Sequence, residues 1–196
     1  MNIIKEKKFY IFEETIKKSK FITYIATICN RSEFERFIEK YKRNDAKHNC
    51  WAYRYGTNNN IKYGYNNDGE PTGTAGEPLL KLIEINNLTN VIIFCVRYYG
   101  GIKLGTGGLQ RAYSNGAIQL LKEIEIKPLE LLYLVKIKFN ISNIKNIKLT
   151  LHNLKVEYSQ EFLNDDVFFT FKIEDLNKLE ILKQHCTIVF QQQDYF

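Results

Sequence analysis

The alternation of apolar and polar positions divides the first two thirds of the chain into strands and helices. Residues 20–30, KFITYIATICN, are rich in β-branched and aromatic side chains and predict a strand. Residues 31–43 carry large apolar side chains at helical spacing, which predicts a helix that Ser32 would cap. Two aromatic runs, 49–56 and 61–65, flank the polar segment TNNN and predict a hairpin.

The same pattern continues towards the middle of the chain. Residues 74–87 predict a helix, because Thr74 and Glu77 fit a T-x-x-E capping box. Residues 90–99, NVIIFCVRYY, are almost continuously apolar and predict a central strand that is covered on both faces. Residues 107–124 then predict a helix with one apolar side.

The last third of the chain has a simpler pattern. It predicts a strand, a helix, a hairpin, a second helix and a closing strand, at 131–139, 141–153, 154–173, 174–184 and 186–192. This βαββαβ order is that of the ferredoxin-like split unit. The fold class expected for the whole chain is α+β.

Glycine and charge both change along the chain. All 11 glycines lie between Gly56 and Gly116. Residues 1–128 hold 20 Lys and Arg against 13 Asp and Glu, a net +7, and residues 129–196 hold 8 against 9, a net −1. We therefore expect two domains, 1–127 and 128–196, with a break near Pro128. The basic first domain suits a polyanionic partner. A lysine-rich surface that only confers solubility would give the same net charge.

Composition indicates where the protein is located and whether it binds a metal or a cofactor. The chain has no apolar run near ~18 residues and no secretory signal, so we expect a cytoplasmic protein without a membrane partner. Its four cysteines are scattered, with no C-x-x-C pair and no zinc-ligand spacing, which favours reduced thiols. We expect neither a metal nor a cofactor.

The most unusual stretch is RYYGGIKLGTGGLQRAYSNGA, residues 97–117, with six glycines. It fits neither the Walker A pattern nor G-x-G-x-x-G. It still places a glycine-rich loop between a strand and a helix start near Thr106, where free N–H groups and the helix dipole favour an anion. A tight crossing that needs glycine only for packing is the alternative. The residues expected to bind a nucleic acid or another anion are Lys20, Arg54, Thr74, Arg97, Lys103, Gly105, Thr106, Gly107, Gly108 and Arg111.

A second loop, NNDGEPTGTAGEP at 66–78, contributes two carboxylates, Asp68 and Glu70. They could serve acid–base chemistry or magnesium binding. We instead expect them to organise the loop through its N–H groups, or to pair with Arg97 or Arg111. No catalytic residue is assigned.

The segment HNCWAYRYG leaves two further possibilities open. His48 and Cys50 would share one face of a strand, so a Cys–His nucleophile is conceivable, although a half-buried strand explains them more simply. On the other face, Trp51, Tyr53 and Tyr55 could stack on bases, although aromatic side chains at this spacing more often belong to the core.

Three motifs, HNCWAYRYG, NDGEPTGTAGEPLL and VRYYGGIKLGTGGLQRAYSNGA, occur in an order and spacing that resembles the Impact/YigZ family. The resemblance covers about residues 1–125, and the remainder is similar to the small C-terminal domain of bacterial members. Asn67 stands where the family commonly has a second Asp beside Asp68, which weakens any two-carboxylate metal site.

The resemblance implies an N-terminal domain like one domain of a small-subunit ribosomal protein and domain IV of elongation factor G. It implies a ferredoxin-like C-terminal domain similar to domain V of that factor. Eukaryotic relatives regulate translation by binding a partner of a kinase that senses amino-acid shortage. We therefore predict a non-catalytic module that binds RNA or the ribosome and influences translation. The alternatives are an enzyme acting on a phosphorylated small molecule at the glycine-rich loops, and a regulator that binds a protein partner.

Overall fold

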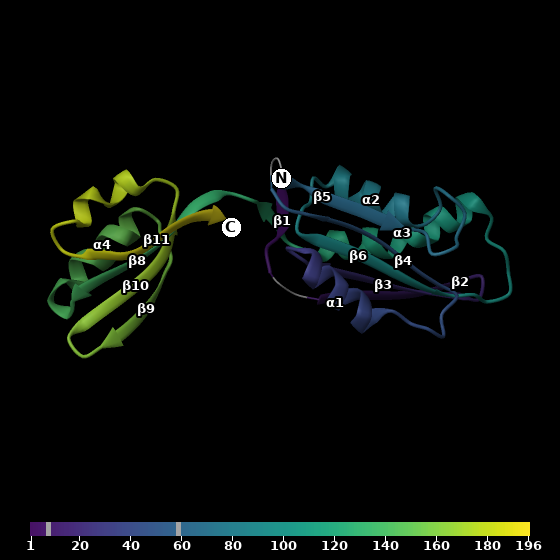
Figure 1. The fold of residues 1–196 in the computed structure, drawn as a ribbon, viewed down its shortest axis with the longest axis horizontal. Coiled ribbons are helices and arrows are strands. Elements are labelled where there is room, and N and C mark those ends of the chain that lie inside the picture. Colours follow the sequence, from purple (N-terminus) through teal and green to yellow (C-terminus); the bar gives the residue numbers. More distant parts are fainter. Residues whose placement is uncertain (7–8, 58–59) are drawn as a thin grey trace. The chain divides into compact units, whose positions relative to one another are not determined.

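A computed structural model describes residues 1–6, 9–57 and 60–196, and these divide into two compact units, Met1–Pro128 and Leu129–Phe196. The first unit contains a five-stranded antiparallel sheet in the order β2-β3-β6-β4-β5 (Figure 1). Its strands are β2 (Phe9–Ile16), β3 (Ser19–Thr27), β4 (His48–Tyr55), β5 (Lys62–Asn66) and β6 (Val91–Tyr98). A separate antiparallel pair joins β1 (Asn2–Ile4) to β7 (Ile126–Pro128).

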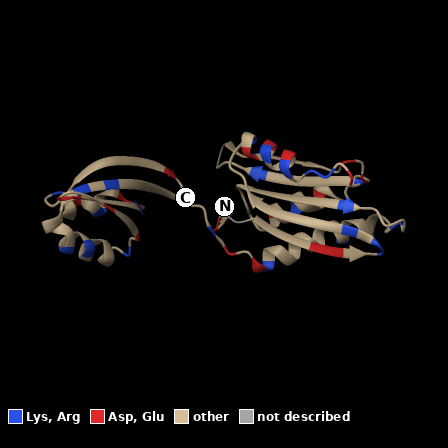
Figure 2. Ribbon diagram, turned by 90° about the horizontal axis from the view of Figure 1, so that it is seen from below, with Lys and Arg blue, Asp and Glu red and all other residues tan. Residues whose placement is uncertain are grey.

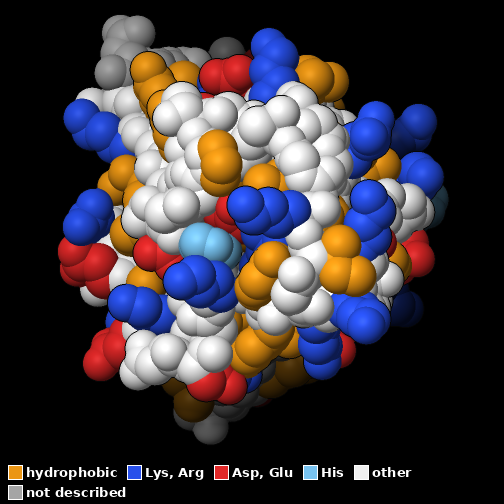
Figure 3. All heavy atoms as spheres, turned by 90° about the vertical axis from the view of Figure 1, so that its right-hand side faces the viewer, with side chains coloured by type: hydrophobic (Ala, Val, Ile, Leu, Met, Phe, Trp, Pro, Cys, Tyr) orange, Lys and Arg blue, Asp and Glu red, His pale blue; other side chains and the backbone are white. Residues whose placement is uncertain are grey.

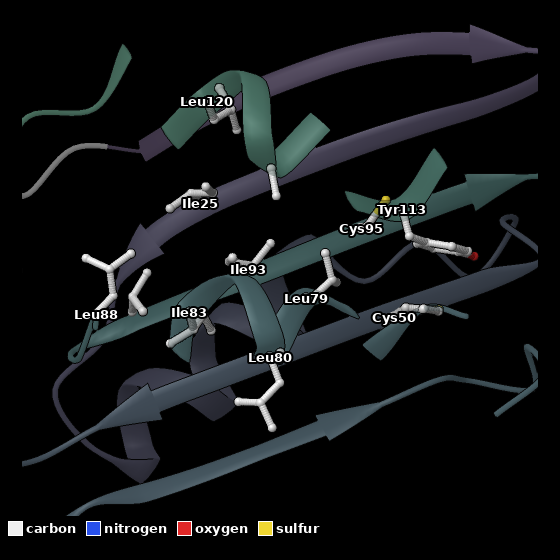
Figure 4. Close-up of a cluster of buried hydrophobic side chains, with 14 of the residues drawn as sticks. Ile25, Cys50, Leu79, Leu80, Ile83, Leu88, Ile93, Cys95, Tyr113 and Leu120 are labelled. Atoms are coloured by element: carbon white, nitrogen blue, oxygen red, sulfur yellow. The ribbon is translucent and has the colours of Figure 1, made fainter. Parts of the chain in front are cut away.

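Helices cover both faces of the five-stranded sheet. The helices are α1 (Arg31–Tyr41), α2 (Gly76–Ile85) and α3 (Thr106–Glu123). Side chains of α2 and α3 pack with Phe21, Ile25 and Ile93 in one core cluster, part of which Figure 4 shows. On the opposite face, Phe34 and Phe37 of α1 pack against the remaining side chains of β3 and β6.

Strand β6 is central, as its apolar run predicts. Its residues from Val91 to Arg97 are all buried, and their side chains alternate between the two core clusters. The strands β1, β2 and β7 were not predicted. Strand β2 shows the reason, because its sequence FYIFEETI mixes apolar and polar residues on an edge where every second residue is exposed.

Two helix starts differ from the predictions. Asn30, not Ser32, caps α1, since its side chain accepts a hydrogen bond from the Glu33 N–H. The T-x-x-E capping box is also wrong, because α2 begins at Gly76 and no side chain of its N-cap residue bonds to it. The Thr74 hydroxyl instead donates to the carbonyl oxygen of Pro71 at 2.7 Å.

The second unit is a four-stranded antiparallel sheet in the order β11-β8-β10-β9. Its elements are β8 (Leu131–Asn140), η2 (Ile141–Asn143), α4 (Ile144–Asn153), β9 (Tyr158–Leu163), β10 (Asp166–Ile173), η3 (Leu176–Leu182) and β11 (Thr187–Tyr195). The helix predicted at 174–184 is therefore a 3₁₀ segment, with Asp175 bonded to the N–H of Asn177. Leu179 and Leu182 of this segment reach the core.

Helix α3 approaches β3 at Gly116, where a side chain would not fit. A Cβ atom at this position would lie 2.3 Å from the Thr23 Oγ1 and 2.8 Å from its Cβ. Glycine therefore sets the spacing between α3 and the sheet, and with it the position of the start of α3.

We predict that Gly116→Ala lowers the free energy of unfolding. Overpacking of this kind costs about 1–3 kcal/mol, which exceeds the ~1 kcal/mol that alanine gains over glycine by helix propensity. Gly107→Ala in the same helix is the control, because no atom lies within 4 Å of its added Cβ. Urea unfolding followed by circular dichroism should show a loss for Gly116→Ala and none for Gly107→Ala. Equal stability of the two variants would contradict this account of the packing.

Candidate nucleic-acid interface

One end of the five-stranded sheet gathers the loops that the sequence singled out. Residues 17 and 18 turn from β2 into β3, and the registers Lys20↔Tyr98 and His48↔Arg97 place the starts of β3 and β4 beside the end of β6. The loops 67–75 and 99–105 lead from this end into α2 and α3 (Figure 1). We call this region the loop end of the first unit.

A buried ion pair lies beneath the loop end. The Arg97 guanidinium donates from Nη1 to the Glu70 Oε1 at 2.5 Å, and the two side chains are 5% and 4% exposed. The same carboxylate oxygen accepts a hydrogen bond from the Tyr113 hydroxyl at 2.8 Å, and the His48 Nε2 lies 3.5 Å from it. Glu70 therefore joins its loop to β6, β4 and α3.

Further contacts hold the Arg97 guanidinium in place. It lies over the rings of Phe21 and Tyr99, at 5.5 and 5.3 Å from their centres. Its Nη2 lies 3.5 Å from the Ser19 Oγ, and that oxygen accepts a hydrogen bond from the Gly100 N–H. Arg97 was predicted to bind an anion. The structure corrects this assignment, because the guanidinium is buried and already paired with a carboxylate.

The loop 67–75 is fixed mainly by its own polar side chains. The Asp68 carboxylate accepts from the Asn49 N–H at 2.6 Å, and the Asp68 carbonyl oxygen lies 2.7 Å from the His48 Nδ1. The Asn67 side-chain oxygen accepts from the Gly76 N–H at 2.8 Å, so the start of α2 is capped from outside the helix. In this structure Asp68 and Glu70 both have partners within the protein.

The glycines of the glycine-rich stretch differ in what requires them. Gly100 is required by packing, because a Cβ atom there would lie 2.0 Å from the backbone of Lys18. Gly105, directly before α3, has a φ of +75°. Gly107 differs from both, since its φ is ordinary and the space around it is open. The fold itself does not require glycine at position 107.

Helix α3 begins without a side-chain cap at this loop end. The first backbone N–H groups of a helix have no hydrogen-bond acceptor within the helix. In α3 these are the N–H groups of Thr106, Gly107 and Gly108. Thr106 and Gly107 are exposed and Gly108 is half-buried. Helix α3 thus begins at Thr106, as the sequence predicted.

Exposed basic side chains surround the start of α3. Lys17, Lys18, Lys103 and Arg111 are exposed, and none forms an ion pair with another described residue. Figure 2 colours the Lys and Arg positions along the ribbon, and Figure 3 shows many such side chains on the end of the first unit that is on the right in Figure 1. Lys20 also lies near this end, where it pairs with Glu13 at 2.7 Å.

Two other predicted binding residues are not exposed at the loop end. Arg54 pairs in register with Val91, at the opposite end of β6 from Arg97, so it is not part of the loop end. Thr74 is buried at 3% exposure and donates its hydroxyl to the Pro71 carbonyl. The direction of β4 determines where Arg54 lies. This direction cannot be seen from the positions of basic residues along the sequence.

Lys17 and Lys18 were not among the predicted binding residues. Both have positive φ, 45° and 65°, in a two-residue turn between strands. A Lys-Lys pair between two strand-like segments could have indicated a basic turn, but only if the segment before it had been recognised as a strand. Arg43 and Lys47 are further exposed basic residues, just before β4, that were not among the predicted binding residues.

The cysteine chemistry considered for His48 and Cys50 finds no support in the structure. Burial raises the pKa of the Cys50 thiol, and its Sγ donates to the Asn67 carbonyl oxygen at 3.0 Å. Burial likewise raises the pKa of Cys95 to about 12 and raises the pKa of the Tyr113 hydroxyl. A protonated, buried thiol is a poor nucleophile near neutral pH. Figure 4 shows Cys50, Cys95 and Tyr113 at one end of the core cluster.

The aromatic strip of β4 belongs largely to the core under α1. The ring of Phe34 lies 5.0 Å from that of Trp51 and 4.6 Å from that of Tyr53, measured between ring centres. Tyr53 in turn stacks on Tyr55 at 5.4 Å. This packing favours the core interpretation over a free stacking surface.

Two kinds of feature are absent from the described residues. Within the ranges 1–6, 9–57 and 60–196, no three His, Cys, Asp or Glu side chains are grouped so that they could hold a metal ion. In the same part of the chain, no helix has the length and apolar character needed to cross a membrane.

Comparison with known proteins assigns the chain to a class. The family model described as the Impact N-terminal domain matches residues 17–121, more than half of the chain. An IMPACT family member of Haemophilus influenzae is 38% identical over 175 residues, which cover 88% of this chain and 77% of that protein. The chain therefore belongs to the Impact family.

Other matches agree with this assignment. The IMPACT family member YvyE of Bacillus subtilis is 41% identical over 116 residues, 58% of this chain and 53% of YvyE. A solved structure described as that of a hypothetical protein is 26% identical, with a TM-score of 0.62 and coverage of 95% of each chain. The mixed α and β fold with antiparallel sheets thus has an experimentally determined counterpart.

We predict that Glu70→Ala strongly destabilises the protein. Removal of one partner of a buried ion pair leaves an uncompensated charge, which costs about 3–5 kcal/mol. Adding Arg97→Met should recover part of this loss, because it removes the remaining charge. Urea unfolding of Glu70→Ala, Arg97→Met and the double variant would measure these effects. Glu13→Ala, which breaks an exposed pair at the same end of the sheet, is the control and should have little effect. A double variant whose loss equals the sum of the two single losses would show that the pair is not coupled.

Proposed function

We propose that the first unit binds RNA, free or in the ribosome, through backbone phosphates at the loop end, and that the protein thereby influences translation in the cytoplasm. The observation that carries this proposal is the arrangement around the start of α3. Lys17, Lys18, Lys103 and Arg111 are exposed without an acidic partner among the described residues, next to a helix start that has no side-chain cap.

These features suit a phosphate for three separate reasons. The helix start presents free N–H groups and the positive end of the helix dipole. The open space at Gly107 lets an oxygen atom reach that backbone. The basic side chains add charge-assisted contacts, which are stronger than neutral hydrogen bonds. Several phosphates spaced along a strand could use these groups together.

Analogy of fold supports the same proposal. The second unit has the element order β8-α4-β9-β10-η3-β11 and the sheet order of a split βαβ unit, which fits the ferredoxin-like domain that the family resemblance implies. The likeness of the first unit to a domain of a small-subunit ribosomal protein and to domain IV of elongation factor G belongs to the proposal as well. This support is associational, since one fold serves many functions.

The rival function, an enzyme acting on a phosphorylated small molecule, has weaker support. Such an enzyme would place Asp68 or Glu70 in a pocket beside the glycine loop. A cavity of about 580 Å³ lies beside α3, but its lining includes neither carboxylate. Both carboxylates are instead bonded to groups of the protein itself. We therefore propose a binding function without catalysis.

The proposal predicts how RNA affinity depends on salt. Neutralising about four phosphates of a single strand gives a slope of log affinity against log salt near −3. Lys17→Gln combined with Lys18→Gln should weaken binding and reduce the steepness of this slope by about 0.7 for each phosphate that is no longer neutralised. Fluorescence anisotropy with a labelled single-stranded RNA at several salt concentrations would measure both quantities.

The matched control is Lys5→Gln combined with Lys122→Gln. It removes the same charge from exposed positions, and Lys122 follows the start of α3 by ~24 Å along the helix axis. The control should keep the slope of the unmodified protein. Equal losses in both double variants would show that only net charge matters, and the loop end would then not be the binding site.

A further inference from the structure

The cavity of about 580 Å³ lies between the end of β2, with its turn, and the outer side of α3. Ile16 and Lys17 line it from the strand, Leu104 from the glycine loop, and Arg111, Ser114 and Ile118 from the helix. Its size is typical of sites that bind small organic molecules. Phosphate binding at the loop end would use Lys17 and Arg111 of this lining and would leave the other lining residues without a contact.

The cavity has a cationic side. Lys17 and Arg111 line it, and neither forms an ion pair with a described residue. Lys17 has a φ of 45°, a backbone conformation that residues other than glycine seldom adopt. The backbone of Gly100 lies against the neighbouring Lys18, so the turn that carries Lys17 is held by packing. The fold therefore fixes the backbone position from which the Lys17 side chain extends.

The remaining wall is apolar. Ile16, Leu104 and Ile118 contribute it, and Ile118 is 37% exposed. An inorganic phosphate would use only the two cations and would leave this wall in contact with water. A ligand that covers apolar surface next to a phosphate-binding pair gains the free energy of burial as well. The lining thus fits a flat organic group joined to an anion.

Polar groups lie between these two sides. Gln110 and Ser114 line the cavity together with Asn115. The Asn115 amide donates to both carboxylate oxygens of Glu14, at 3.0 and 2.9 Å, which fixes the helix to β2 beside the cavity. Hydrogen-bonding groups beside an apolar wall match the edge of a nucleobase better than they match an aliphatic side chain.

We propose that this cavity binds a nucleotide, with the base against Ile16, Leu104 and Ile118 and the phosphate on Lys17 and Arg111. The nucleotide can be free or can be one unit of an RNA strand. The second source rests on the function proposed above, whereas the first does not. When the nucleotide is part of an RNA strand, its base leaves the stack of neighbouring bases and enters the cavity, and the neighbouring phosphates bind along the loop end.

Calorimetric titration of the full chain with AMP, UMP, ribose 5-phosphate and inorganic phosphate tests the proposal. We expect at least one mononucleotide to bind tenfold or more tightly than ribose 5-phosphate, which lacks the base. Ser114→Phe fills the cavity without a change of charge and should abolish this preference. Ile118→Asp is a second variant in case the first does not fold, and Lys122→Gln is the unaffected control. Equal binding of all four ligands would overturn the proposal.

The same variants separate this proposal from the proposed function. Ser114→Phe should weaken RNA binding at least threefold while the salt slope stays unchanged, because the phosphate contacts remain. If Ser114→Phe and Ile118→Asp bind RNA and mononucleotides as the unmodified chain does, the nucleotide site is wrong and the phosphate-binding function stands. If mononucleotides bind and RNA does not, the nucleotide site stands and the RNA function is wrong. An acidic peptide that binds in place of every nucleotide would also overturn the nucleotide site.

Discussion

The ion pair between Arg97 and Glu70 organises the loop end of the first unit. A guanidinium and a carboxylate are costly to bury, and their attraction offsets this cost only when further hydrogen bonds complete the site. Here Tyr113 from α3 donates to the same carboxylate, and Ser19 from β3 lies beside the guanidinium. The pair thereby links strands β3 and β6, the loop 67–75 and the first half of α3.

The buried and the exposed basic residues of the loop end differ in whether they have an acidic partner. Arg97 has its counter-charge inside the protein, whereas Lys17, Lys18, Lys103 and Arg111 have none among the described residues. The glycines also differ in their roles, because Gly100 and Gly116 are needed for close packing and Gly107 is not. Under the proposed function, the stretch that carries most of the glycine serves both the fold and an approaching ligand. In our account, the buried pair holds the backbone so that exposed cations and free N–H groups stay in place.

The sequence allowed much of this structure to be predicted. The apolar run of β6, the helical spacing of α1 and α3 and the βαββ part of the second unit were all visible as periodic patterns. The errors came where tertiary contacts decide. Asn30 and Asn67 are better placed than Ser32 and Thr74 to cap helices, and the segment 176–182 forms a 3₁₀ helix.

The candidate site was harder to predict than the fold. The start of α3 at Thr106 was predicted correctly, because a helix start can be recognised locally. The burial of Arg97 and the remote position of Arg54 depend on strand direction and register, which single residues do not reveal. Lys17 and Lys18 were overlooked because the edge strand before them has no strong periodic signal.

Ultraviolet crosslinking in cells, followed by mass spectrometry of the crosslinked peptides, tests the central claim most directly. The claim is that the full chain contacts RNA through the loop end of the first unit. It predicts nucleotide adducts on peptides that contain residues 17–20 and 97–111. Adducts confined to residues 129–196 or to the opposite end of the sheet, or a complete lack of RNA adducts on the purified chain, would contradict it.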